Sequence, residues 1–284
     1  MKIVVCIKQV PDTNEVKLDP KTNRLIRDGV PSIINHDDKS GIEAALQLKE
    51  KVGGTVTVVC MGPPQADVAL REALAMGCDE AYLLSAREFG GSDTCATAII
   101  ISTALKKIGY DIVITGRQAI DGDTAQVGPQ VAEKLGLTQI TYAEEILKVG
   151  DGSITVKRHI DGGVETVEGP LPIVITVNGS AAPCRPRNAK LVQKYKHAKT
   201  ITEKQQGNLD YTDLYDTRDY LNLVEWSVAD VNGDLKQCGL SGSPTNVKAI
   251  QNSVFQAKES KTISGSDREV EELIVELLEN HTIG

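Results

Sequence analysis

The sequence predicts an α/β fold with a doubly wound, mainly parallel sheet. The first observation is a series of short apolar runs, each with the length of a buried strand: KIVVCIKQV, TVTVVCMG, EAYLLS and DIVITG. The second is that stretches with one apolar helical face alternate with these runs over roughly the first 135 residues. Such apolar strands are covered by helices on both faces, and the sheets they form bind ligands beyond the carboxyl ends of the strands.

Three helices are expected between the four strands. Their expected positions are residues 37–52, residues 65–76, and from Ser92 or Asp93 to Gly109. In the first helix, Ser40 and Glu43 have the spacing of a capping box. In the second, apolar residues recur every three or four positions until Gly77 ends the helix.

The insert between the first strand and the first helix, residues 11–38, is too long for a plain connection. The pairs Lys17-Leu18 and Leu25-Ile26 lie on either side of the turn sequence DPKTN and predict a small surface hairpin. Long loops at the ends of strands are where binding residues tend to lie.

The character of the sequence changes after about residue 140. The stretches ITVKRHIDGG and VETVEGPLPIVITVN predict antiparallel strands joined at Gly162-Gly163, in an extension of about residues 140–180. A basic segment of about residues 185–199 follows and completes a first domain, residues 1–200. Residues 201–284 are polar and are expected to form an arm that lies on a partner chain. The arm ends in an amphipathic helix whose apolar face is Val270, Leu273, Ile274 and Leu277.

Composition excludes several classes of function. A net charge of −8 and an aromatic content of 4% argue against a nucleic-acid partner, which requires clustered positive charge and stacking platforms. The sequence has no apolar run long enough to insert into a membrane and no signal peptide, so we expect a cytoplasmic protein. The six cysteines are scattered and the four histidines lack metal-ligand spacing, so no metal site is expected. No catalytic residue is expected either, because the sequence shows no Ser/His/Asp order or P-loop signature and Cys6 ends a buried apolar strand.

The stretch GRQAIDGDTAQVGPQVAEKLG, Gly116–Gly136, is the strongest candidate for a binding site. It follows a strand, and we expect its helix to open at Asp123-Thr124, with Asp123 as the N-cap. The unpaired N–H groups of Thr124 to Val127 could then receive a pyrophosphate without any lysine. Gly122 would permit close approach of the ligand, and Asp121 is either a turn former or an acceptor for a hydroxyl. The simpler alternative is a strand, a turn and a capped helix with nothing bound.

Four stretches together resemble the beta subunit of electron-transfer flavoproteins, particularly those of the NADH-oxidising, electron-bifurcating group. They are IVVCIKQVPD, CMGPPQADVALREALAMGCDEAYLL, the Gly116–Gly136 stretch, and ITVKRHIDGGVETVEGPLPIVITVN followed by PRNAKL. The resemblance covers nearly all of the first two hundred residues and is weak in the tail. It implies a Rossmann-like, adenine-nucleotide-binding domain within a heterodimer of alpha and beta chains.

The resemblance implies a nucleotide site at the expected carboxyl edge of the sheet. The positions that match the family's adenosine contacts, together with neighbours of the first helix, are Cys6, Asn35, His36, Asp38 and Met61. Those that match its binding loop are Gly116, Arg117, Gln118, Asp121, Gly122, Asp123, Thr124, Ala125, Gln126 and Val127. The sequence DGDTAQVGP is similar to the FAD-bearing version of this loop, and AMP is the alternative.

The resemblance also implies partners. These are the alpha subunit, a flavin-dependent acyl-CoA-type dehydrogenase, and ferredoxin as a further electron acceptor, with NADH as the electron donor. The basic segment matches the family's recognition loop, with Leu191 at the position of its docking leucine and Arg187 and Lys194 beside it. Its ending, KYKHAKT, interrupts the usual lysine-rich sequence. A solvated helix face is the alternative for this segment, and a nucleotide-sensing module without redox chemistry is the alternative for the chain.

Overall fold

The structure is a computed structural model that describes residues 1–12, 31–150, 152–207, 212–245, 260 and 262–280. The chain divides into two compact units, Met1–Asn246 and Val247–Gly284. The surface hairpin expected around Lys17-Leu18 and Leu25-Ile26 lies outside the described residues.

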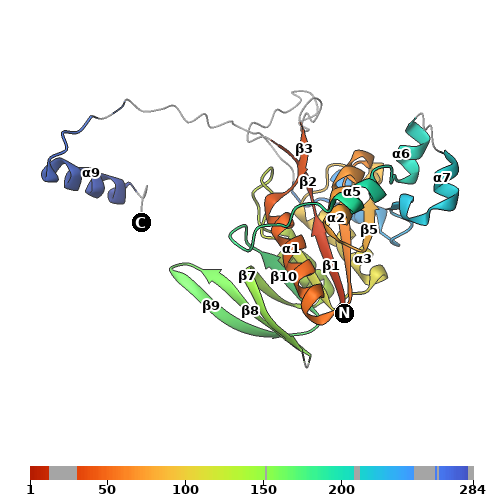
Figure 1. Ribbon diagram of the computed structural model, residues 1–284, viewed down its shortest axis with the longest axis horizontal. Coiled ribbons are helices and arrows are strands. Elements are labelled where there is room, and N and C mark those ends of the chain that lie inside the picture. Colours follow the sequence, from red (N-terminus) through yellow and green to blue (C-terminus); the bar gives the residue numbers. More distant parts are fainter. Residues whose placement is uncertain (13–30, 151, 208–211, 246–259, 261, 281–284) are drawn as a thin grey trace. The chain divides into compact units, whose positions relative to one another are not determined.

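The first unit is built on a nine-stranded sheet with the order β11-β5-β4-β1-β6-β10-β7-β8-β9 (Figure 1). Every pairing from β11 to β7 is parallel, and β7-β8 and β8-β9 are antiparallel. The strands are β1 Lys2–Ile7, β4 Thr55–Met61, β5 Glu80–Leu84, β6 Ile112–Gly116, β7 Thr138–Gly150, β8 Ser153–Ile160, β9 Gly163–Pro170, β10 Ile173–Val177 and β11 Val224–Trp226. A separate antiparallel pair joins β2, Gln9–Pro11, to β3, Ser32–Ile34. The predicted doubly wound fold with an antiparallel extension is therefore confirmed.

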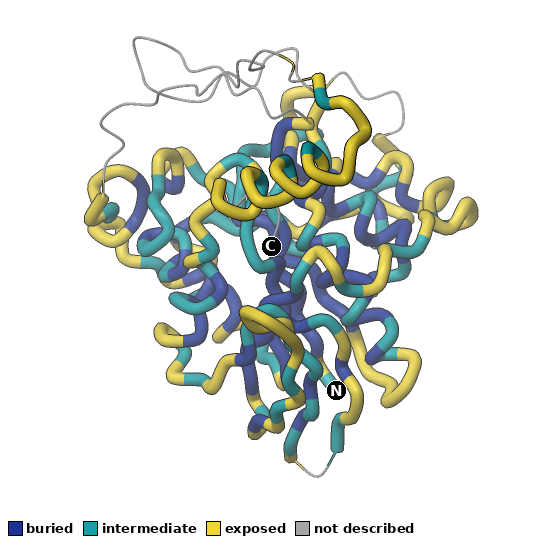
Figure 2. The backbone as a smooth tube through the Cα atoms, turned by 90° about the vertical axis from the view of Figure 1, so that its left-hand side faces the viewer, coloured by how far each residue is buried: buried dark blue, intermediate teal, exposed yellow. Residues whose placement is uncertain are grey.

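Helices cover both faces of the parallel strands. The helices are α1 His36–Val52, α2 Asp67–Met76, α3 Thr94–Ile108, α4 Val127–Leu135, α5 Ala189–Tyr195, α6 Ile201–Gln206, α7 Thr212–Thr217, α8 Gly239–Gly242 and α9 Asp267–Glu279, and short 3₁₀ turns occupy Pro64–Ala66, Arg87–Phe89, Asp219–Leu221 and Leu235–Gln237. α1 and α2 bury apolar residues in one core layer, and α3 and α4 bury theirs in the other. Figure 2 shows the buried positions gathered along the central strands. None of the helices that the structure describes combines the length and apolar character needed to cross a bilayer.

The predicted capping box of the first helix is wrong. The helix begins at His36 with Asn35 as its N-cap residue, so Ser40 and Glu43 both lie inside it. Glu43 instead accepts hydrogen bonds from Arg185, 142 residues further along the chain. The Glu43 side chain, which the local spacing assigned to the helix cap, is therefore bonded to an arginine that is distant in the sequence. The third helix agrees with the prediction, because the Asp93 side chain accepts the N–H of Ala96.

The expected antiparallel strand VETVEGPLPIVITVN is two strands. β9 pairs antiparallel with β8, whereas β10 lies between β6 and β7 and pairs parallel with both. Burial gives the physical reason, because all five residues of β10 are buried and every residue of β9 except Glu165, Val167 and Gly169 is exposed. The continuous apolar run of β10 fits a central parallel strand.

The first part of the expected C-terminal arm belongs to the first unit. β11 pairs with β5 in the sheet, and Val228, Val231 and Cys238 are buried in the core that contains α3 and α4. The boundary between compact units therefore falls near residue 246 and not at residue 200. The described residues from 212 to 245 lack strong periodicity because they contribute scattered single side chains to an existing core, which needs no amphipathic helix.

Candidate functional site

The order of the strands places a switch point between β1 and β6. β1 is followed by α1, whose buried residues face one core layer, and the adjacent β6 leads to α4, whose buried residues face the other. Neighbouring strands whose connections leave to opposite faces form a crevice at their carboxyl ends. The segment after β6 begins there, and residues 116–127 are called the nucleotide loop below.

Asp38, in the first turn of α1, lies between the ends of these two strands. Its carboxylate accepts the backbone N–H of Lys8 at 2.7 Å and that of Gly116 at 3.0 Å. Burial raises the pKa of Asp38 to about 7, and the two backbone hydrogen bonds oppose this rise. A Cβ atom at Gly116 would come within 2.2 Å of an Asp38 oxygen, so this approach requires glycine.

Asn35 is bound to the nucleotide loop through both ends of its side-chain amide. Its Nδ2 donates to the carbonyl of Gln118 at 2.7 Å, and its Oδ1 accepts the N–H of Ile120 at 3.1 Å. Asn35 is fully buried, and it makes no side-chain capping bond to α1. The loop after β6 is thus fixed to the residue that precedes α1.

The predicted helix start at Asp123-Thr124 is wrong. α4 begins at Val127 with Gln126 as the N-cap residue, and Asp123 caps no helix. Asp123 and Ala125 have φ values of 50° and 52°, in the left-handed region that a right-handed helix excludes. Non-glycine residues in this region are uncommon and concentrate at functional sites.

The last four residues of the loop, 124–127, still present the expected N–H donors. Within the described part of the chain, the N–H groups of the four residues 124–127 have no hydrogen-bond partner. Thr124 is exposed, so a ligand can reach this stretch of backbone. Successive free N–H groups in a stretch with left-handed residues form a concavity that suits an anion. Three of the four donors, at residues 124–126, come from the loop that leads into α4, and only the N–H of Val127 belongs to the first turn of the helix itself.

The acidic side chains near these amides are each engaged. Lys8 lies 2.6 Å from Asp121, and Arg117 lies 3.5 Å from Asp37. The Asp123 carboxylate accepts the side-chain amide of Gln118. The two cations reduce the negative charge that a phosphate would meet, and the Gln118 amide occupies an oxygen of Asp123.

Other expected site residues also lie at this edge of the sheet. Cys6 is 7% exposed, and burial raises the pKa of its thiol to about 12, in keeping with a packing role. Met61 ends β4 and is partly buried, and His36 is exposed at the first residue of α1. A Cβ at Gly122 would meet open space, so the fold itself does not require this glycine.

Sequence reasoning missed four residues beside the loop. The hydroxyl of Thr94 donates to Gln126 at 2.9 Å and accepts from Gln130 at 3.3 Å. Lys8 was detectable, because it directly follows the first strand. Tyr142 was not detectable from the sequence, because its position depends on a bulge in β7. At this bulge Tyr142 has a φ of 58°, and its ring lies 5.6 Å from the guanidinium carbon of Arg117.

The segment 185–199 lies against α2 and is held at both ends. Arg185 bonds Glu43 at 2.8 Å, and Arg71 donates to the carbonyl of Ala198 at 2.8 Å. Leu191, the expected docking residue, is partly buried against the core of its own chain, whereas Val192 is 40% exposed. Lys194 lies over the rings of Tyr195 and Tyr220, and Arg187 is exposed.

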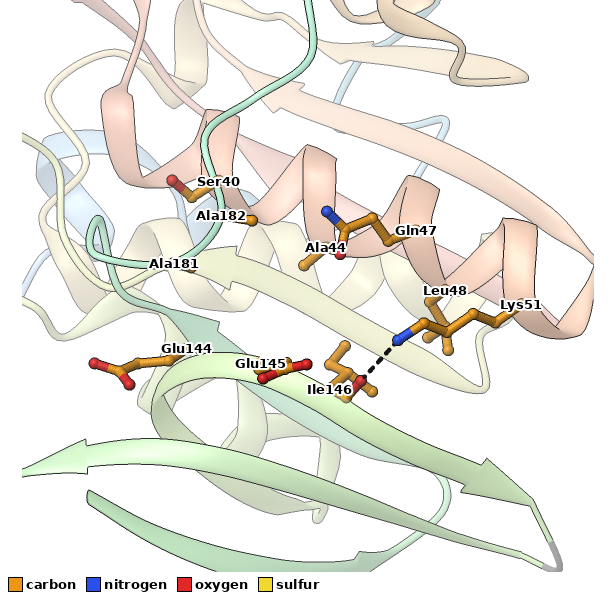
Figure 3. A pocket seen from close by; sticks show the side chains of 10 residues that line it. All are labelled: Ser40, Ala44, Gln47, Leu48, Lys51, Glu144, Glu145, Ile146, Ala181 and Ala182. Carbon is orange, nitrogen blue, oxygen red and sulfur yellow. Dashed lines mark hydrogen bonds between the residues drawn. The ribbon is translucent and has the colours of Figure 1, made fainter.

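A small pocket of about 190 Å³ lies elsewhere, between α1, β7 and Ala181-Ala182 (Figure 3). Lys51 crosses it and donates to the carbonyl of Ile146 at 3.3 Å. Pockets for drug-sized ligands measure about 300–1,000 Å³. The pocket is therefore too small for a dinucleotide, and the open nucleotide loop remains the candidate site.

Fold and site together define a doubly wound α/β protein whose switch-point loop can receive an anion. A family model, the electron transfer flavoprotein domain, matches residues 22–206. The electron transfer flavoprotein subunit beta of Thermoanaerobacterium thermosaccharolyticum is 45% identical over 100% of both chains. The subunit of the same name from Clostridium acetobutylicum is 48% identical over 87% of this chain and 86% of its own.

A third relative is the caffeyl-CoA reductase-Etf complex subunit CarD of Acetobacterium woodii, which is 45% identical over 87% of this chain and 86% of its own. The chain belongs to the electron transfer flavoprotein family and corresponds to its beta subunit. The family implies flavin-related electron transfer together with an alpha subunit.

Proposed function

We propose that the nucleotide loop holds FAD and that the chain works in electron bifurcation together with its alpha subunit. When bound, FAD would supply the uptake of a hydride from NADH and the release of its two electrons singly, one for a low-potential carrier such as ferredoxin and one for the flavin of the alpha chain and then a dehydrogenase. The observation that carries the proposal is the run of four free N–H groups at residues 124–127, at the switch point.

The residues of this chain bind and orient the cofactor. The four N–H groups receive the pyrophosphate, and the hydroxyl of Thr124 is a further donor. Arg117, which lies near the Tyr142 ring, adds positive charge within the loop. Exposure of Thr124 and Gln126 leaves room for a ligand as long as a dinucleotide.

The segment 185–199 is proposed to dock the partner dehydrogenase. It carries the exposed cations Arg187, Lys190, Lys194 and Lys196 next to the exposed apolar side chain of Val192. The name of CarD, which refers to a complex with caffeyl-CoA reductase, supports a partner that acts on acyl-CoA compounds. The second unit, which contains α9, is proposed to pack on the alpha subunit, since Val270, Ile274, Val275 and Leu278 are exposed on it.

Counting the released nucleotides tests the proposal. The complex with the alpha subunit is denatured, and FAD and AMP are separated and quantified. Two FAD per heterodimer are expected. One FAD with one AMP would replace bifurcation by simple electron carriage with AMP in the loop. One FAD per heterodimer without AMP would mean that no nucleotide is bound to this chain, and would contradict the proposed site.

A further inference from the structure

We propose that the pocket between α1 and β7 is a binding site for a small linear zwitterion, a molecule with an ammonium group at one end and a carboxylate at the other. Glu145 receives the ammonium group, and Lys51 receives the carboxylate. The inference goes beyond the proposed function and does not rest on it, because none of the residues that line the pocket belongs to the nucleotide loop.

The pocket is small and elongated along α1. Ser40, Ala44, Leu48 and Lys51 line it at intervals of three or four positions, which places them on one face of the helix. They extend over about three turns, or roughly 16 Å at about 1.5 Å per residue. The volume of about 190 Å³ is the share of about six water molecules in the liquid. A ligand that fills this pocket is therefore thin and has few non-hydrogen atoms.

Opposite charges line the pocket without neutralising each other. The Lys51 ammonium group donates to the neutral carbonyl of Ile146 at 3.3 Å, at one end of the pocket (Figure 3). The Glu145 carboxylate has neither a hydrogen-bond partner nor an ion-pair partner among the described residues. Lys51 and Glu145 thus line one pocket without forming an ion pair, and a ligand can meet a positive and a negative group at separate positions.

The other carboxylate of the lining, that of Glu144, is already engaged. It accepts the hydroxyl of Ser180 at 3.2 Å. It also lies 3.5 Å from Nδ1 of His159 and 3.7 Å from the ammonium group of Lys157. Of the two carboxylates in the pocket, Glu145 is therefore the one available to an ammonium group.

The hydroxyl of Ser40 indicates that the pocket has an occupant. Ser40 is 7% exposed and lines the pocket, and its hydroxyl bonds to no other group in the part of the chain that the structure describes. Buried polar side chains in native proteins nearly always have a hydrogen-bond partner. A serine hydroxyl can accept an N–H as well as donate, so it can share the ammonium group with Glu145.

The lining between the polar ends is apolar. Ala44 and Leu48 lie between Ser40 and Lys51 on the same face of α1, and Ile146 lies on β7 across from them (Figure 3). A methylene chain placed here leaves water, and each buried methylene adds to affinity. The pocket therefore selects an ω-amino carboxylate, whose two charges are separated by methylene groups, over a simple amine or a simple carboxylic acid.

Ligands of graded length test the inference in the complex with the alpha subunit. Glycine, 4-aminobutyrate and 6-aminohexanoate are titrated by calorimetry, with hexylamine and hexanoate as analogues that carry one charge. We expect the better of the two longer zwitterions to bind about tenfold more tightly than glycine or either analogue, since it alone makes both charged contacts. Saturable binding by none of the zwitterions would overturn the inference, and so would equal binding of a single-charge analogue.

Two substitutions remove the charges one at a time. Glu145→Gln and Lys51→Met keep the approximate size of each side chain, and each should weaken binding of the preferred zwitterion about fivefold. Both residues are exposed, so the melting temperature should stay within a few degrees of the parent. Lys148→Met is the matched control, because Lys148 is an exposed lysine of β7 that does not line the pocket. Equal loss of affinity in Lys51→Met and Lys148→Met would show a general charge effect and overturn the inference.

A third substitution tests the location through shape alone. Ala44→Leu places a larger side chain in the pocket and should abolish binding of the zwitterion. Leucine is a good helix former, so α1 should persist, which circular dichroism can verify. A folded Ala44→Leu protein that binds the zwitterion as tightly as the parent would place the ligand elsewhere and overturn the inference.

Discussion

The ammonium group of Lys8 lies 2.6 Å from the carboxylate of Asp121, and the Asp121 side chain is only 4% exposed. This ion pair connects the end of β1 to the nucleotide loop. Asp121 precedes the free N–H groups by only a few residues. Removal of its partner would leave a buried, uncompensated negative charge close to the proposed pyrophosphate position.

Lys8→Ala is therefore expected to weaken FAD or AMP binding about tenfold, because a neighbouring unpaired carboxylate repels the diphosphate. Isothermal titration of the complex measures this. Lys49→Ala is the matched control, since Lys49 also lies 2.6 Å from an aspartate, Asp79, but outside the nucleotide loop. Equal losses of affinity in the two variants would show a general charge effect and contradict this role of the pair.

Thr124→Asp tests the anion site directly. The new carboxylate would lie at the position proposed for the pyrophosphate, so nucleotide bound to this chain should be lost. Thr124 is exposed, and the fold should therefore be intact by circular dichroism. Thr124→Ser keeps a small neutral hydroxyl and should retain nucleotide. Stoichiometric FAD or AMP in the aspartate variant would count against the assignment.

Glu43 should make the fold sensitive to acid. Burial by itself would raise the pKa of Glu43. The hydrogen bonds from Arg185 and its charge have the larger effect, so that the pKa of Glu43 lies below its usual value of 4.5. A carboxyl whose pKa is lower in the folded state contributes stability above its unfolded pKa and loses it as the pH falls. This contribution should therefore be complete well above the unfolded pKa of 4.5 and be lost as the pH falls through the lower pKa of the folded state.

Glu43→Gln should lower the free energy of unfolding at pH 7 by about 1–2 kcal/mol, as for the loss of a charged hydrogen bond to a buried carboxylate. The parent and the variant should converge in stability at pH 3, which urea denaturation at both pH values can measure. Glu50→Gln is the control on the same arginine, because Glu50 is exposed and should contribute little. A constant difference between parent and Glu43→Gln across this pH range would contradict the linkage.

We expect Leu191 to contribute to the stability of the fold and its neighbour Val192 to contribute to docking of the dehydrogenase. Leu191 is partly buried against its own core, so Leu191→Ala should lower the free energy of unfolding by about 1–2 kcal/mol. Val192 is 40% exposed, and Val192→Asp should leave stability unchanged but slow electron transfer to the copurified dehydrogenase. Stopped-flow reduction of the dehydrogenase flavin measures the second effect. Unaltered transfer in Val192→Asp would leave Leu191 as the docking residue.

Several features of the fold were predictable because they depend on local pattern. β1, β4, β5 and β6 were recognisable as apolar runs of strand length, and the helices between them as amphipathic stretches. Local rules failed at the start of α4, where the left-handed residues Asp123 and Ala125 delay the helix to Val127. Aspartate is among the residue types enriched in this region, but alanine is not, so at Ala125 the conformation is imposed by the surroundings.

The sequence by itself determined the alternation of strands and helices, the family resemblance and the stretch in which a nucleotide site should lie. Tertiary structure alone decided that β10 enters the middle of the sheet, that β11 extends its edge, and that Asn35 bonds to the nucleotide loop. The physical reason is the distance along the chain over which each interaction acts. Periodicity and capping act over a few residues, whereas Asn35 meets Gln118 across 83 positions of the chain and β10 acquires its neighbours only when the sheet assembles.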